Sequence, residues 1–440
     1  MPATNKQKLS LPILTSLVIG NMIGTGIFLL PSALAAYGSI SLLAWILTST
    51  GALFLALTFG NLNRKMPKSG GAYIYCKEAY GNFVGFLVAY TYWISLWVAT
   101  AGIAVSTIGY LGVIIKGAQP DTHPFLIFFV EVAVVWFFTL VNIIGILTAG
   151  FIQLVLTVLK IAPLVIIIIF GLFKIDFGNF SQFNISGEPS FNALTHSAAL
   201  IVWAFIGLET ATIPAENAHS SADVYKATVY GTLLTALIYI LSTIVLMGLI
   251  PPDILKNSTA PFADVATLLF GKHMAVAVAV CAIVAGIGSI NVCTLLQGQI
   301  PFVAARDHLF PRIFSKVSRF GTPIGSQIIS AILITIVLVF TTNAALMKQF
   351  NFLALLATLA TLVTYFICTL AEMKFLLRDS PKIHWRGFIK PFVVACVAAI
   401  YSFWMMVGAA KDILLYGTLL VVISIPIYFW LIAKKNPKSI

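Results

Sequence analysis

The sequence is poor in charge and in the residues from which catalytic and metal sites are usually built. Only 9% of its 440 residues are charged, whereas 60% are hydrophobic. The five cysteines are scattered and form no C-x-x-C pair, so neither a disulfide framework nor a zinc site is indicated. The six histidines fall in loops or at the ends of apolar runs, which argues against a buried haem ligand pair. No Walker-type phosphate loop is present. We therefore expect no metal and no cofactor.

Long apolar runs, in contrast, recur along the whole chain. A helix that crosses a bilayer needs roughly 20 predominantly apolar residues. The chain contains twelve such runs, so the predicted fold class is an all-α integral membrane protein with twelve transmembrane helices. The runs lie near residues 12–35, 41–63, 84–115, 124–145, 151–173, 195–214, 227–250, 274–300, 326–343, 352–373, 389–409 and 413–433.

The placement of the basic residues orients the protein in the membrane. The formal net charge is +12. If the N-terminus is cytoplasmic, nineteen of the 26 Lys and Arg residues fall on the cytoplasmic side, six fall outside, and Lys160 lies within a run. Cytoplasmic loops of membrane proteins carry such an excess. We therefore expect both termini in the cytoplasm, contact with anionic membrane lipid, and no nucleic-acid partner.

The first apolar run is interrupted in its middle. Small and polar residues stand there among apolar ones, namely Gly20, Asn21, Gly24, Thr25 and Gly26. A broken helix in hydrocarbon leaves unpaired N–H and C=O groups, each costly by roughly several kcal/mol, and is tolerated only where it lines a cavity or binds something. The second half-helix would then present N–H groups and a positive dipole to an anion. The alternative is a seam of small residues where two helices pack closely.

The sixth run carries a similar interruption. Gly207 and Glu209 break its apolar sequence, and Pro214 and Glu216 end it. This interruption opens the second group of five runs, as the first interruption opens the first group. Interrupted helices at corresponding positions in two halves are typical of inverted-repeat transporters. The pairing favours substrate binding at both breaks over a packing seam.

Further polar residues lie inside or between the other runs. Tyr92, Leu96 and Thr100 recur at fourfold spacing on one face of the third run. Glu131 lies near the outer end of the fourth run and is expected to reach the interface. Residues 64–81 contain breakers and tyrosines, which are compatible with either an interfacial loop or a partly inserted gate.

Four stretches together resemble the amino acid–polyamine–organocation transporters, and most closely the bacterial arginine/agmatine antiporters and the polyamine and basic amino acid exchangers. The likeness runs over nearly the whole chain. The stretches are GNMIGTGIFLLP at 20–31, PKSGGAY at 67–73, WAFIGLE at 203–209 and DHLFP at 307–311. The resemblance implies a LeuT-type fold of five plus five inverted helices, with helices 1 and 6 broken. This core would span residues 1–388, followed by two accessory helices and a cytoplasmic tail over 389–440.

The resemblance also implies roles for individual residues. The first break would hold a substrate carboxylate, carbonyls of the sixth-run break would hold its amino group, and Trp203 would cover the substrate. Tyr73 and Glu209 would act as gates, and Lys160 with Ser289 would couple transport to its driving force. The substrate-binding residues expected on this basis are Asn21, Ile23, Gly24, Thr25, Gly26, Tyr92, Leu96, Thr100, Trp203, Ala204, Ile206 and Cys293.

Some positions depart from the arginine/agmatine antiporters. These have a tryptophan where Cys293 stands and an asparagine where Thr100 stands. Their tenth-span serine, which helps to hold the guanidinium, is missing, because Leu355 and Ala357 occupy that region, and His308 replaces the usual glycine. We therefore expect the pocket to prefer a neutral or moderately sized side chain over arginine.

Lys160 lies about ten residues into the fifth run and matches a lysine found in some proton-dependent or sodium-independent relatives. Ionisable groups in the bilayer usually face a partner, a cavity or a pathway. The expected partners are carbonyls freed at the first break, near residues 19–22, and the Ser289 hydroxyl. Three roles stay open: an amine that titrates and couples conformation to protons, a permanently charged tie, and a lysine that snorkels to the cytoplasmic face.

These features predict a secondary active amino acid transporter, a permease or antiporter that works by alternating access in the bacterial inner membrane. An exchanger of polyamines and basic amino acids is the alternative. A membrane enzyme is not indicated, because no nucleophile–base motif appears. A channel is not indicated either, because no filter-like ring repeat is present. Proton coupling and a homodimer are left open by the sequence.

Overall fold

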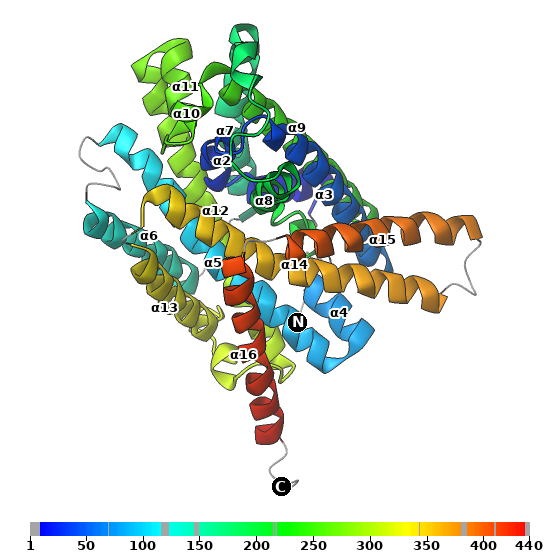
Figure 1. Cartoon of the computed structure of the whole chain (residues 1–440). Coiled ribbons are helices and arrows are strands. Elements are labelled where there is room, and N and C mark those ends of the chain that lie inside the picture. The colour runs from blue at the N-terminus through cyan, green and yellow to red at the C-terminus, as the bar shows by residue number, and fades with distance from the viewer. Residues whose placement is uncertain are drawn as a thin grey trace.

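The protein is a multi-pass helical membrane protein (Figure 1). The computed structural model describes residues 9–68, 70–115, 123–144, 149–213, 215, 218–342, 344–379, 385–408 and 411–435. Eleven helices in these ranges are long and apolar enough to cross a membrane, and a helix pair bent by 45° near the N-terminus makes a twelfth span. The predicted class is therefore confirmed, and the described chain contains no β-strand.

The spans follow the predicted order. They are α1 (Leu11–Met22) with α2 (Gly26–Ala35), α3 (Ile40–Lys65), α5 (Asn82–Ile114), α6 (Pro124–Ile144), α7 (Ala149–Gly171), α8 (Ser190–Val202) with η3 (Trp203–Phe205) and η4 (Thr210–Thr212), α9 (Ser221–Leu249), α12 (Lys272–Arg306), α13 (Ile324–Thr341), α14 (Leu346–Asp379), α15 (Trp385–Val407) and α16 (Lys411–Lys435). Shorter helices connect them, namely α4 (Ala72–Tyr80), η1 (Leu172–Lys174), η2 (Phe177–Phe180), α10 (Pro252–Leu255), α11 (Pro261–Phe270) and η6 (Arg312–Ser315). The sequence did not predict α10 and α11, because their apolar stretches are too short to read as spans.

Contacts between the spans come in matched pairs. The first span packs on the seventh (α1 on α9) as the sixth packs on the second (α8 on α3). The third packs on the tenth (α5 on α14) as the eighth packs on the fifth (α12 on α7), and α5 meets α13 as α12 meets α6. Exchanging the first five spans for the second five thus maps one set of contacts onto the other. This is the relation expected of two inverted repeats.

The third span, α5, lies at the centre of the bundle. It packs against α12, α13, α14 and α6, so its side chains from Gly85 to Tyr110 are buried almost without interruption. Trp93 belongs to this packing and not to a membrane-interface belt, because its Nε1 donates to Ser330 Oγ at 2.8 Å and its ring meets Phe314. The outermost helices, α15 and α16, lie at the edge of the bundle (Figure 1) and expose apolar faces that suit lipid.

The structure corrects the expectation for Glu131. Its side chain does not reach an interface but is buried at 2% exposure. It lines a small cavity between α6 and the start of α14, together with Thr342 and Gln349. The sequence suggested otherwise because the position lies near a helix end, whereas burial depends on how closely the next helix packs.

The segment 64–81 is more ordered than a plain interfacial loop. Gly70 and Gly71 turn the chain with φ of +118° and +51°, in the region that favours glycine, and α4 follows directly. Tyr73, Tyr75 and Cys76 on this short helix are buried against α5 and α14. The segment therefore packs against the spans themselves. Because α3, α4, α12 and α14 all carry Lys or Arg at this end of the bundle, we call it the basic end.

The long helix α12 ends in a Schellman motif centred on His308. The Leu309 N–H donates to the Ala304 carbonyl at 2.8 Å and the His308 N–H to the Ala305 carbonyl at 3.1 Å. The motif requires a left-handed residue, and His308 has φ of +61° with an exposed side chain. The helix end thus has the geometry of a glycine cap although the residue is histidine.

We expect substitutions of His308 to separate backbone from side-chain effects. His308→Val should destabilise the protein by about 1–2 kcal/mol, because a β-branched residue resists the left-handed conformation. His308→Gly should change stability little, because relief of strain is offset by about 0.5–1 kcal/mol of chain entropy. Thermal unfolding in detergent measures both, with His123→Val as an exposed control without positive φ. Equal behaviour of the Val and Gly variants would contradict the expectation.

Candidate functional site

The two helix breaks face each other across the middle of the bundle. At the first break α1 ends at Met22 and α2 begins at Gly26. At the second, the helical path ends at Phe205, Ile206 is extended and Gly207 has φ of +97°. The Asn21 side chain links the breaks, since its Nδ2 donates to Thr210 Oγ1 at 2.6 Å. It also rests directly on Gly207, where a Cβ atom would overlap it, so glycine is required there for conformation and for space.

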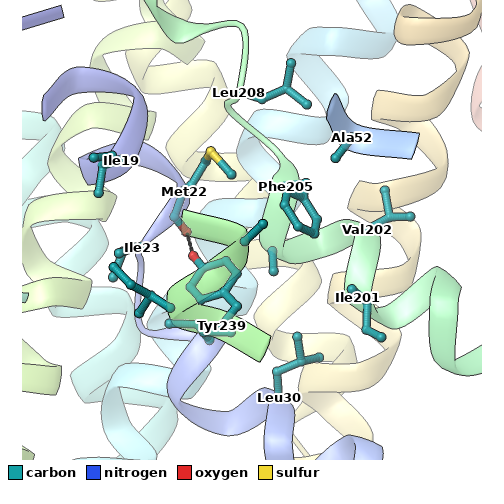
Figure 2. Close-up of a cluster of buried hydrophobic side chains, with 14 of the residues drawn as sticks. Ile19, Met22, Ile23, Leu30, Ala52, Ile201, Val202, Phe205, Leu208 and Tyr239 are labelled. Atoms are coloured by element: carbon teal, nitrogen blue, oxygen red, sulfur yellow. Dashed lines mark hydrogen bonds between the residues drawn. The ribbon is translucent and has the colours of Figure 1, made fainter. Parts of the chain in front are cut away.

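Side chains from other spans satisfy part of the backbone freed by the first break. The Gly20 carbonyl accepts from Lys160 Nζ at 2.9 Å, and the Met22 carbonyl accepts from the Tyr239 hydroxyl at 2.7 Å. Figure 2 shows the second bond among the buried side chains that fix Tyr239, including Phe205 and Leu30. These two bonds stabilise the break in place of the backbone hydrogen bonds that a continuous helix would form.

Other backbone groups at the breaks have no partner in the described chain. The N–H groups of Thr25, Gly26 and Ile27 begin α2 without an acceptor. On the facing break the carbonyl oxygens of Ala204 and Ile206 accept no bond. Donors on one side and acceptors on the other match the carboxylate and the ammonium of an α-amino acid.

A cavity of about 40 Å³ lies between the breaks. Its walls come from both breaks, α5 and α12. The lining residues are Asn21, Met22, Gly24, Gly26, Ile27, Tyr92, Leu96, Ala99, Ile103, Trp203, Ala204, Ile206, Gly207 and Cys293. The Trp203 indole lies against Gly26, where a Cβ atom would overlap its Nε1, and meets Phe350 edge-on. The Trp203 ring thus fills the space directly in front of Gly26 at the start of α2.

Nine of the twelve residues expected to bind substrate line this cavity, and three do not. Ile23 packs in the apolar core beside Tyr239 (Figure 2). Thr25 turns its hydroxyl to α5, where it bonds the Ile103 carbonyl at 3.1 Å. Thr100 bonds the Leu96 carbonyl of its own helix at 2.8 Å. Any contribution of Thr25 to binding would therefore come from its backbone and not from its hydroxyl.

Glu209 sits behind the second break, where two tyrosines bind its carboxylate. The hydroxyls of Tyr92 and Tyr365 each donate to one of its carboxylate oxygens. Tyr365 also accepts from the Gly207 N–H at 3.3 Å, so it connects the carboxylate to the break itself. The sequence did not single out Tyr365. The only signal in the sequence was the position of this tyrosine inside a span, next to the polar stripe of α14. A tyrosine hydroxyl buried there needs a hydrogen-bond partner.

Lys160 has the contacts expected from the sequence. The ammonium is completely buried and donates to the Gly20 carbonyl at 2.9 Å and to Ser289 Oγ at 3.2 Å. It therefore joins α7 to the first break and to α12. Gly24 makes room for this arrangement, because a Cβ atom there would lie 3.1 Å from Ser289 Oγ. These contacts exclude the snorkelling alternative for this conformation.

At the basic end, α4 is tied to the end of α12. The Tyr73 hydroxyl and Lys77 Nζ donate to Asp307 Oδ2 at 2.5 and 2.6 Å. Burial and the hydrogen bond to Asp307 raise the pKa of Tyr73, which keeps its hydroxyl protonated. Burial opposes ionisation of Asp307, but its bonds from Lys77 and Tyr73 outweigh this and hold its pKa below the usual value. The link is therefore intact above the ordinary range of aspartate and is lost only as pH falls through that lowered pKa.

Two residues expected to end the sixth span, Pro214 and Glu216, lie outside the described residues. Asp307 and Lys77, in contrast, were not predicted as site residues. The DHLFP stretch was noted only as part of a resemblance, and both partners of Asp307 come from a helix more than 200 positions away. Pairing over that distance is decided by packing.

Comparison with known proteins agrees with this geometry. The amino acid permease family matches residues 9–438. A putative arginine/ornithine antiporter of Bacillus subtilis is 30% identical, covering 91% of this chain and 92% of its own length. The putrescine transporter PotE of Escherichia coli is 30% identical over 97% of both chains. An arginine/ornithine antiporter of Pseudomonas aeruginosa is 32% identical, covering 96% of this chain and 90% of its own length.

We expect Gly26 to be needed for binding and not for folding. Gly26→Leu would fill the space in front of the free N–H groups and push against Trp203, so bound amino acid should be lost. Counterflow of labelled amino acids in proteoliposomes measures the loss, and thermal unfolding in detergent controls for folding. Normal counterflow by a folded Gly26→Leu variant would rule out this site.

Proposed function

The chain belongs to the amino acid permease family of secondary transporters, and we propose that it moves α-amino acids by alternating access around the cavity between the two helix breaks. The observation that carries the proposal is the facing arrangement of unpaired groups. The N–H groups at the start of α2 would hold the carboxylate, and the Ala204 and Ile206 carbonyls would hold the ammonium. Counterflow of a panel of labelled amino acids in proteoliposomes tests it, because a carrier exchanges substrate against its own gradient and a channel does not.

The positive-inside bias supports an orientation with both termini and the basic end in the cytoplasm of a bacterial inner membrane. In this orientation the link from Tyr73 and Lys77 to Asp307 would close the cytoplasmic entrance. Glu209, tied to both α5 and α14 through tyrosines, would transmit rearrangement of the second break to those helices. The gating role proposed for Tyr73 and Glu209 rests on these bonds.

The wall that faces the substrate side chain is apolar. Leu96, Ala99, Ile103 and Cys293 line it, and no described carboxylate opens into the cavity. A guanidinium or a second ammonium would find no counter-charge there. This supports a neutral or moderately sized side chain. The second candidate, exchange of basic amino acids or polyamines, is supported by the printed activities of the relatives and by Trp203, whose ring could stack on a cation.

Cys293→Trp should separate these candidates. The added ring would offer a guanidinium a second stacking face, so preference should shift toward arginine or agmatine at the expense of small neutral amino acids. Competition of unlabelled amino acids, agmatine and putrescine against labelled substrate measures the shift. Cys281→Trp, on the same helix but outside the cavity lining, is the matched control. Tight arginine/agmatine exchange by the unmodified protein would reject the neutral candidate.

Lys160 is proposed to couple transport to protons. While charged, it ties α7 to the Gly20 carbonyl and to α12 through Ser289. Loss of its proton would remove one of the few interactions that hold the first break in place, so proton binding and conformation would be linked. A permanently charged tie is the structural alternative, because two good acceptors stabilise an ammonium that never titrates.

Uptake against external pH, with and without sodium, distinguishes the roles of Lys160. If the lysine titrates, uptake by the unmodified protein should depend on pH and not on sodium, and Lys160→Ala should lose the pH dependence. Val158→Ala, at an exposed position two residues away on the same helix, is the control. Sodium-stimulated uptake would refute the coupling role, and unchanged pH dependence in Lys160→Ala would leave only the structural tie.

A further inference from the structure

A second fully buried carboxyl group lies away from the substrate cavity. Glu372, on the part of α14 nearest the basic end, has no solvent exposure. Its side chain lies beside Thr58 and Asn61 of α3. The Thr58 hydroxyl and the Asn61 amide lie close enough to interact with the carboxyl group, but neither carboxyl oxygen nor the equally buried Thr58 Oγ1 forms a hydrogen bond of ordinary geometry with a described residue. An acid and a hydroxyl that are both unpaired and adjacent require an explanation.

The cation that acts on Glu372 is already engaged with another carboxylate. Lys65 on α3 favours the ionised acid electrostatically, but it lies 3.4 Å from Asp379. Lys374 on α14 is committed to the Ala79 carbonyl at 2.7 Å. Helix α5 carries no charged residue, and the described titratable groups that α4 buries against α5 and α14 are Tyr73, Tyr75 and Cys76. On α15, Lys390 is exposed.

An isolated carboxylate in such a place is strongly unfavourable, and a buried group of this kind takes up a proton instead. The protonated acid gains a donor, and Thr58 Oγ1 is a free acceptor beside it. The same proton thus removes the charge and supplies the missing hydrogen bond.

Glu372 also shares a helix face with the residue that holds Glu209. Tyr365 lies seven positions, or two turns, before it on α14, about 10 Å along the helix axis. Phe59, next to Thr58 on α3, packs edge-on against the Tyr365 ring. Tyr365, which binds Glu209, and the buried Glu372 therefore both lie at the contact between α3 and α14. A separation of these helices at the basic end would hydrate Glu372 and alter the packing of Tyr365 together.

From this geometry we infer that Glu372 is a proton-binding site at the contact between α3 and α14, protonated while the basic end is closed and deprotonated when the two helices separate. Proton binding then favours the closed arrangement, and a rise in pH on that side favours opening. One linked proton changes the open-to-closed ratio by up to about tenfold per pH unit. The inference does not depend on which solute is transported.

Infrared spectroscopy of the protein in lipid nanodiscs tests the protonation directly. The spectrum of the unmodified protein minus that of Glu372→Gln should show the carbonyl stretch of a protonated acid at neutral pH. Glu78→Gln, which removes an exposed glutamate paired with Lys68, should show only a carboxylate band. Thr58→Val keeps Glu372 and removes its acceptor, so the acid band should move to higher wavenumber. This second variant serves even if Glu372→Gln does not fold.

Thiol labelling tests the link to opening. Cys76 on α4 and Cys368 on α14 are buried with their sulfurs 3.4 Å apart, one turn from Glu372. Maleimide labelling of these two peptides, followed by mass spectrometry, should rise with pH more steeply in the unmodified protein than in Glu372→Gln. Comparing the two proteins at the same pH cancels the effect of pH on the intrinsic reactivity of the thiols. Absence of a protonated-acid band that depends on Glu372, or equal labelling slopes, would overturn the inference. Neither readout uses a transported solute, so failure here is distinct from failure of the proposed transport function.

Discussion

The need to satisfy backbone N–H and C=O groups away from water is the constraint on which the rest of this structure depends. Two spans give up their helical hydrogen bonds in the middle of the bundle, where each unpaired group is costly by roughly several kcal/mol. Long side chains from distant spans replace the lost bonds: Lys160 for Gly20, Tyr239 for Met22 and Tyr365 for Gly207. The breaks are therefore held by tertiary contacts and could not persist in isolated helices.

The groups that remain unpaired are those that face the cavity. The start of α2 leaves donors, and the carbonyls of Ala204 and Ile206 leave acceptors. A zwitterion would supply an acceptor to the N–H groups of the first break and a donor to the carbonyls of the second. Binding would then complete the hydrogen bonding of the bundle, which gives a physical reason for a solute to influence how the two repeats sit against each other.

Three ionisable side chains are completely or almost completely buried near these elements, and each is accommodated in a different way. Lys160 has acceptors on two other spans. Glu209 has two tyrosine donors. Glu372 accepts no hydrogen bond of ordinary geometry from a described residue. The first two arrangements stabilise a charge by geometry, whereas the third favours an uncharged acid.

The sequence by itself determined the number and order of the spans, the two breaks and the need of Lys160 for hydrogen-bond acceptors. These follow from local composition: runs of roughly 20 apolar residues must cross the bilayer, and glycines with polar residues inside a run can only mark a break or a seam. A lysine in mid-span needs carbonyls, and a nearby break is where carbonyls are free. The family resemblance added an expectation of which break residues line the cavity.

Only the tertiary structure decided where side chains on these elements point and which distant partners they meet. Thr25 and Thr100 are neighbours of cavity-lining residues in the sequence, but they do not line the cavity themselves. Their hydroxyls bond instead to backbone carbonyls of α5. Tyr365 and Asp307 obtained their roles from residues more than 150 positions away. Periodicity gives the face of a helix, but the neighbour on that face depends on how all twelve spans pack, and this is a property of the whole chain.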